Sequence, residues 1–219
     1  MKQVWLIFLK DIQQEFKTRY AINAILLFAI VTLSAVSFSI GTYTATARIL
    51  ASLFWIILFF SSMSGLSHIF IREEETHTAD TLKLVARPTS IYLGKFLFNL
   101  ILLMLLEVIL IPLFIAVMNF KILNYQIFLL TLLIGNFGLA AGGTMVAAII
   151  SKASTKGALF TVLSFPILLP VLISGISATR KASESVKLME AQNELQALFA
   201  YGVIIIVTSV LLFDFVWNE

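Results

Sequence analysis

The sequence predicts an all-α membrane protein in which six transmembrane helices follow an amphipathic helix. The first observation is composition: 60% of the 219 residues are hydrophobic, 12% are charged, and the mean hydropathy is +1.01. Soluble domains contain about 45–50% apolar and about 25% charged residues, so a soluble globule and a disordered chain are excluded. The second observation is the spacing of the lysines and arginines, which leaves six long apolar stretches between them.

Residues 1–20 are expected to form an amphipathic helix in the headgroup plane of the membrane. Lys10, Gln13, Gln14 and Lys17 share one side of this helix. The apolar positions recur at helical spacing and are Trp5, Phe8, Leu9, Ile12, Phe16 and Tyr20. An anchoring helix and a connecting helix that transmits motion both fit this pattern.

Six transmembrane spans are expected after this helix. Each gap between basic residues is at least 19 residues long, and a helix needs roughly 20 apolar residues to cross the hydrocarbon. A helix satisfies its own backbone in lipid, whereas these stretches lack the alternation of β-barrel strands. The chain is therefore expected to be one transmembrane domain with spans near 21–40, 49–71, 94–118, 127–150, 157–176 and 196–214.

The basic residues also predict the orientation. Ten fall in the amino-terminal segment and in the loops after the second and fourth spans: Lys2, Lys10, Lys17, Arg19, Arg72, Lys83, Arg87, Lys95, Lys152 and Lys156. Five fall on the other side: Arg48, Lys121, Arg180, Lys181 and Lys187. The positive-inside rule therefore predicts a multi-pass protein of a bacterial inner membrane with both termini in the cytoplasm.

The loop after the second span is the most polar stretch and the candidate docking element. It carries three consecutive carboxylates, followed by a segment that can form one or two helical turns. Pro88 is expected to end this piece before the third span opens at Gly94. A solvated loop and a docking element both remain open, and the docking hypothesis rests on Glu73, Glu74, Glu75, Thr78 and Leu82.

No catalytic motif accompanies this loop. The chain lacks a nucleotide-binding loop and a nucleophile–base arrangement, and it contains no cysteine. Neither His68 nor His77 has a recognised metal-ligand spacing. The chain is therefore not expected to be an enzyme, to hold a metal or to bind nucleic acid, and any ATPase is expected to be another chain.

Glu107 is the ionisable residue deepest in a predicted span. A carboxylate that faces lipid costs several kcal/mol, so it is expected to face protein or a cavity. A gating hydrogen bond, a proton-coupled site and a purely structural interhelical hydrogen bond all remain open. Asn99, two turns earlier, is a candidate member of the same polar track.

Prolines interrupt two of the predicted spans. Pro112 is expected to bend the third span, and Pro166 and Pro170 are expected to kink or break the fifth. A broken helix suits a moving gate. The small-residue pattern from Gly138 to Gly142 predicts close helix packing in the fourth span.

The polar loop, from Arg72 through His77 to Gly94, resembles the glutamate-rich segment of ABC-2-type exporter membrane subunits. More narrowly, the chain resembles the haem exporter protein B (CcmB) family, the permease of cytochrome c maturation. The stretches that carry this resemblance are Phe59–Leu66, Arg72–Glu75, Tyr92–Lys95 and Phe165–Ile173. His77 departs from the broader pattern, because ABC-2 chains often have glycine there.

The resemblance implies an ABC-2-type fold and a complex with a separate ATP-binding subunit, with two copies of each. It also implies a haem-handling membrane protein and a periplasmic haem chaperone as partners. Haem is then a transported or handled ligand and not a tightly bound cofactor.

Three alternatives remain open at this stage. They are an ABC-2 exporter of another lipid-like or glycan substrate, a non-transporting scaffold that couples ATP hydrolysis to a partner, and a proton-coupled carrier centred on Glu107. The single intramembrane carboxylate and the lack of visible repeats weaken the last of these.

Overall fold

All regular secondary structure in the described part of the chain is helical. The computed structural model describes residues 2–40, 45–151, 156–184 and 186–218. Six segments of these residues are long and apolar enough to cross a membrane, which confirms the predicted six-span fold. The elements are α1 (Lys2–Thr18), α2 (Tyr20–Ile40), α3 (Ala47–Leu66), α4 (His68–Glu75), α5 (Ala79–Val85), α6 (Pro88–Met118), α7 (Tyr125–Ile150), α8 (Lys156–Ser183), the 3-10 turn η1 (Leu188–Ala191) and α9 (Gln192–Asn218).

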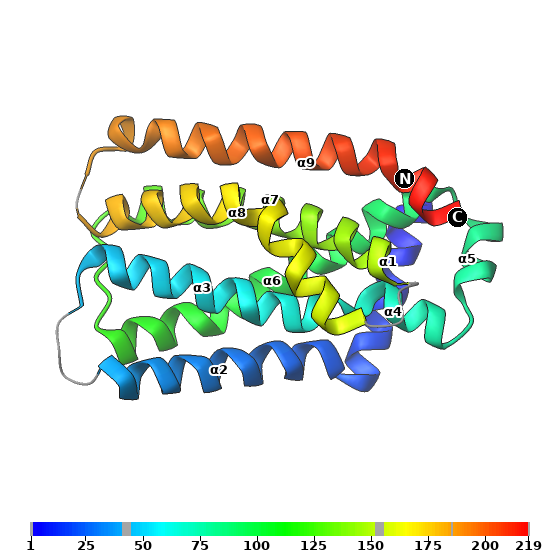
Figure 1. The fold of residues 1–219 in the computed structure, drawn as a ribbon, viewed down its shortest axis with the longest axis horizontal. Helices are drawn as coiled ribbons and strands as arrows, with labels where there is room; N and C mark the ends of the chain where they lie inside the picture. The colour runs from blue at the N-terminus through cyan, green and yellow to red at the C-terminus, as the bar shows by residue number, and fades with distance from the viewer. Residues whose placement is uncertain (1, 41–44, 152–155, 185, 219) are drawn as a thin grey trace.

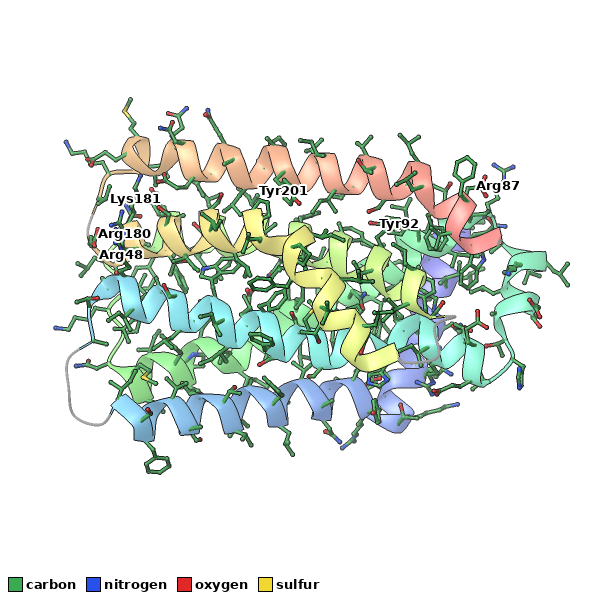
Figure 2. All side chains as sticks on the ribbon, in the orientation of Figure 1. Arg48, Arg87, Tyr92, Arg180, Lys181 and Tyr201 are labelled. Atoms are coloured by element: carbon green, nitrogen blue, oxygen red, sulfur yellow. The ribbon has the colours of Figure 1, made fainter. Side chains whose placement is uncertain are left out.

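The long helices run side by side, and α7 is the central one (Figure 1). It packs against α8, α9 and α6, while α2 packs on α3 and α6 at one edge of the bundle. Both chain ends lie at the same end of the bundle as α1, α4 and α5 (Figure 1), and this end is called the terminal end. Figure 2 shows Arg87 there, whereas Arg48, Arg180 and Lys181 lie at the opposite end.

The third span begins earlier than the sequence predicts. Pro88 does not end the preceding piece, because it occupies the first turn of α6. Helix α5 already ends at Val85, and Ala86 and Arg87 are extended. Proline suits this position because its fixed φ matches the helix and its missing N–H would have no helical partner there. Gly94 and Lys95 therefore lie inside the helix and not at its start.

Helices α8 and α9 also extend beyond their predicted bounds, as far as Ser183 and from Gln192. A charged contact at the opposite end joins the two extensions. Lys181 Nζ lies 2.6 Å from Glu194 Oε1, and Ser177 Oγ donates to the same atom at 3.2 Å. The basic residues in the last turn of α8 also interact favourably with the negative end of the helix dipole.

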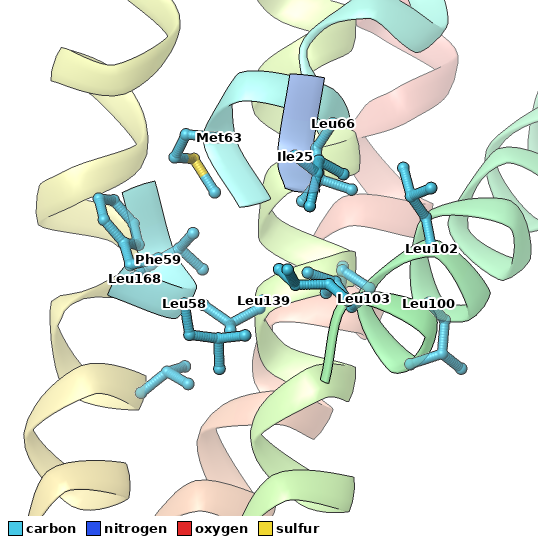
Figure 3. Close-up of a cluster of buried hydrophobic side chains, with 14 of the residues drawn as sticks. Ile25, Leu58, Phe59, Met63, Leu66, Leu100, Leu102, Leu103, Leu139 and Leu168 are labelled. Atoms are coloured by element: carbon cyan, nitrogen blue, oxygen red, sulfur yellow. The ribbon is translucent and has the colours of Figure 1, made fainter. Parts of the chain in front are cut away.

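Small residues allow α7 to approach its neighbours closely. A Cβ added at Gly142 would lie 2.6 Å from Leu168 of α8, and one at Gly138 would lie 2.9 Å from Val171. Figure 3 shows Leu168 and Leu139 beside Leu58 and Phe59 of α3 in the buried cluster. The predicted small-residue pattern thus lies in a contact between helices, where dispersion replaces the hydrophobic effect as the attraction.

The turn between α4 and α5 contains His77, which stands where ABC-2 chains often have glycine. His77 has a φ of 54°, a left-handed conformation that glycine adopts without steric cost. Its N–H donates to Glu74 O at 3.2 Å, and the next N–H donates to Glu73 O at 2.9 Å. The turn keeps the geometry that suits glycine, although a histidine occupies the position.

Candidate functional site

A buried cluster of charges lies at the terminal end, where α1, α4 and α6 meet. Lys95 is fully buried, and its Nζ lies 2.9 Å from Glu73 Oε1 and 3.4 Å from Asp11 Oδ2. It also donates to Ile69 O at 3.0 Å. Lys10 pairs with Glu73 and lies 3.4 Å from Asp11 Oδ1. We call Lys10, Asp11, Glu73 and Lys95 the ion cluster.

Glu73 also connects the ion cluster to α5. Thr78 Oγ1 donates to Glu73 Oε2 at 2.6 Å, so the two carboxylate oxygens have different partners. One faces the lysines, and the other holds the residue that precedes α5. Glu73 thus links the residue that precedes α5 to Lys10 of α1 and Lys95 of α6.

The docking role expected of Glu73, Glu74 and Glu75 stays a prediction, but the Glu73 side chain faces the ion cluster and not solvent. Its side chain is only 5% exposed, and its charge is compensated inside the chain. Glu74 is half-buried, whereas Glu75 is exposed. Three successive residues on a helix point in different directions, since each is rotated by about 100° from the last.

No sequence pattern indicated Lys10, Asp11 and Lys95 as site residues. Lys95 is expected from the sequence at the opening of the third span, beside Gly94. Pro88 could have indicated that Lys95 lies inside a helix, because a helix that starts at Pro88 places Lys95 seven residues after its first residue. Asp11 and Glu15 had no such signal, although both lie on the buried face of α1.

Glu15 fixes the corner between α1 and α2. Arg19 adopts a left-handed conformation with a φ of 53°, and Glu15 Oε1 accepts from the Ile22 N–H at 2.9 Å. A carboxylate suits the amino terminus of α2 because the first N–H groups of a helix have no internal partner. The amphipathic helix is thus joined rigidly to the first span.

Helix α5 exposes two large apolar side chains beside the polar Asp80 and Thr81. Leu84 is 89% exposed and Val85 is 68% exposed, and Figure 1 shows α5 at the extreme of the terminal end. A groove of about 470 Å³ separates α5 from α1. Leu82 and Thr78 line it from α5 and its cap, together with Lys10, Gln13, Gln14 and Lys17 from α1. We call Leu84, Val85 and this groove the α5 surface.

Glu107 faces the bundle and pairs with α7. Asn136 Nδ2 donates to Glu107 Oε2 at 2.8 Å, and both side chains are buried. Asn99 Nδ2 donates to Thr144 Oγ1 at 2.8 Å. Asn99 and Glu107 are eight positions apart on α6, and Asn136 and Thr144 are eight positions apart on α7. The antiparallel helices α6 and α7 are therefore joined by two polar contacts that lie about two turns apart.

Replacement of Glu107 tests what this contact requires. Glu107→Gln keeps an acceptor oxygen for Asn136 and is expected to change stability by less than about 1 kcal/mol. Glu107→Leu leaves the Asn136 amide unpaired and is expected to cost about 1–3 kcal/mol. Denaturant unfolding in mild detergent compares the two variants. Equal losses would show that the hydrogen bond contributes nothing.

The prolines lie within helices that continue past them. Pro112 is inside α6, and Pro166 and Pro170 are inside α8. The fifth span, expected to be kinked or broken, is one continuous helix that changes direction along its length (Figure 1). The gate function expected of the three prolines stays a prediction.

A family model described as CcmB protein matches residues 2–215 of the chain. The match includes the ion cluster, the α5 surface and all six spans up to the last turn of α9. Among curated proteins, none matches the chain.

Proposed function

Because the chain belongs to the CcmB family, an ABC-2-type permease component of haem export in cytochrome c maturation, we propose that it is the membrane half of a complex driven by a separate ATPase. The complex contains two copies of each, a haem-handling membrane protein and a periplasmic haem chaperone. Haem is the ligand that this complex handles.

The α5 surface is the proposed contact with the ATPase. The observation that carries this proposal is the pair of exposed apolar side chains on α5 at the end of the bundle, Leu84 at 89% and Val85 at 68% exposed. Its short connections to α4 and α6 limit its independent movement. Lys17 lines the adjoining groove and adds positive charge for an acidic partner.

Three contacts support transmission from α5 to the bundle. Thr78 connects α5 to the ion cluster through Glu73. Lys83 Nζ lies 5.7 Å from the centre of the Trp217 ring in α9, a cation–π contact. Gln3 of α1 donates to Val85 O at 3.2 Å. A push on α5 thus reaches α1, α6 and α9 together, which a two-state switch requires.

The orientation proposed for the membrane places the terminal end in the cytoplasm. The shared end of both termini and α5 supports this assignment, as does the distribution of basic residues, of which Lys152 lies outside the described residues. A cysteine at exposed Asp80 is expected to resist a membrane-impermeant reagent added from outside, and one at exposed Glu184 to react. The reverse labelling would overturn the orientation.

Leu84→Asp tests the ATPase contact. Because the side chain is exposed, the variant is expected to fold normally and to bind the ATPase at least about tenfold more weakly, as for a residue central to an interface. Co-purification with the ATPase, its hydrolysis rate and cytochrome c maturation in cells are the measurements. Charge reversal at Glu73 is unsuitable for this purpose, since it disrupts the ion cluster.

Met189→Asp is the matched control, because Met189 is 83% exposed at the opposite end. It is expected to leave ATPase binding unchanged. If Leu84→Asp also gives normal values in all three measurements, the ATPase does not dock on the α5 surface.

A further inference from the structure

A cavity of about 370 Å³ lies at the corner between α1 and α2, beside the junction of α3 and α4. Its volume falls in the range of about 300–1,000 Å³ for small-molecule sites. It shares Gln14 with the groove of the α5 surface, but all its other lining residues differ. Its buried wall includes the apolar Phe98 and Ile69 together with the carboxylates Asp11 and Glu15, while its more exposed rim is polar and includes Arg72, Glu75 and Tyr20.

The position of the cavity corresponds to the headgroup layer of a membrane. Tyr20 is the first residue of the first span, and α1 precedes the spans. The corner between them therefore lies where hydrocarbon meets water, the level at which tyrosine side chains gather. The apolar part of the buried wall, below a polar rim, matches the acyl and headgroup parts of a phospholipid.

The guanidinium of Arg72 is held in place by neutral groups and keeps its positive charge available for an anion. Its Nη1 donates to Thr18 Oγ1 at 3.4 Å. When the side-chain amide of Gln14 is oriented with its oxygen toward Arg72, that oxygen accepts hydrogen bonds from Arg72 Nε at 3.0 Å and from Arg72 Nη2 at 3.1 Å. These neutral groups orient the guanidinium without cancelling its charge, and Arg72 has no salt bridge within the described residues. A guanidinium has five N–H groups, so two remain for a phosphate.

The other charges of the rim favour an ammonium group beside that phosphate. Glu75 lies three residues after Arg72, on the same side of α4, and its exposed carboxylate has no hydrogen bond or salt bridge in the described part of the chain. His68 and Tyr20, which are in edge-to-face contact with ring centres 4.5 Å apart, lie beside it. Asp11 and Glu15 also line the cavity but are occupied by the ion cluster and the Ile22 N–H.

From this arrangement we propose that the cavity binds the headgroup of phosphatidylethanolamine. The phosphate is bound by Arg72, and the primary ammonium is bound by Glu75. The acyl chains leave along the apolar wall toward α2 and α3. An anionic headgroup such as that of phosphatidylglycerol offers the phosphate but no cation for Glu75, and a choline headgroup has no N–H to donate to it.

The test is lipid retention by the purified subunit, measured by native mass spectrometry in micelles that contain phosphatidylethanolamine, phosphatidylcholine or phosphatidylglycerol. The unaltered chain is expected to retain phosphatidylethanolamine in preference to the other two. Arg72→Gln is expected to reduce retention of phosphatidylethanolamine and phosphatidylglycerol about tenfold, as loss of a charge-assisted hydrogen bond implies. Glu75→Gln is expected to remove the preference for phosphatidylethanolamine while leaving phosphatidylglycerol bound.

Arg87→Gln and Asp80→Asn are the matched controls, because both residues are exposed at the terminal end and outside the cavity. Both are expected to retain lipid as the unaltered chain does. Inorganic phosphate and glycerophosphoethanolamine serve as competitors. Displacement by phosphate alone would overturn the lipid assignment, and so would a phosphatidylethanolamine preference that survives Glu75→Gln. Glu75 is exposed, so its replacement keeps the test valid even if Arg72→Gln unfolds the chain.

Discussion

Lys95→Met is expected to destabilise the folded chain by about 3–5 kcal/mol. The replacement fills much of the same volume but leaves the buried carboxylates of Glu73 and Asp11 with one cation in place of two. Removal of one partner from a buried ion pair is costly because an uncompensated charge stays in a medium of low polarity. The measurement is denaturant unfolding in mild detergent, with tryptophan fluorescence as the signal.

Lys121→Met is the control for Lys95→Met, because Lys121 is exposed at the opposite end and its loss is expected to change stability by less than about 0.5 kcal/mol. Adding Glu73→Gln to Lys95→Met is expected to restore part of the loss. The double variant leaves Lys10 and Asp11, whose charges balance at 3.4 Å. A strictly additive double variant would show that the cluster does not act as a unit.

Trp55→Ala is expected to cost about 3 kcal/mol or more, as large-to-small changes in packed interiors do. Trp55 is fully buried and lies between α7 and α8. Its Nε1 donates to Thr179 Oγ1 at 2.8 Å, so the replacement also leaves a buried hydroxyl without this partner. Thermal unfolding of the purified chain measures the loss.

The space for Trp55 exists because two glycines face it. A Cβ at Gly135 or at Gly175 would lie 2.5 Å from the indole ring, so Gly135→Ala is expected to cost about 1–3 kcal/mol through overpacking. Gly202→Ala is the control, since its Cβ would meet nothing closer than 3.9 Å. In the Trp55→Ala background, Gly135→Ala is expected to become neutral. If it stays as costly there, steric contact with Trp55 is not the cause.

The spans and their number could be predicted from the sequence because hydropathy is a local property. A run such as 127–150 is apolar enough to enter a membrane whatever it packs against. The common end of the two termini follows from the even number of crossings. Helix ends were predicted less well, and Pro88 is the example: proline both ends and begins helices, and the choice depends on the residues around it.

The partners of the polar residues were decided by the tertiary structure alone. The sequence required Glu107 to face protein, since its cost in lipid is independent of any neighbour, but it did not indicate Asn136. Lys95 and Asp11 are 84 residues apart, and Trp55 and Thr179 are 124 apart. Such pairs depend on the rotation and register of helices that touch only in the folded bundle. No spacing along the chain encodes that register, because it results from side-chain packing among several helices at once.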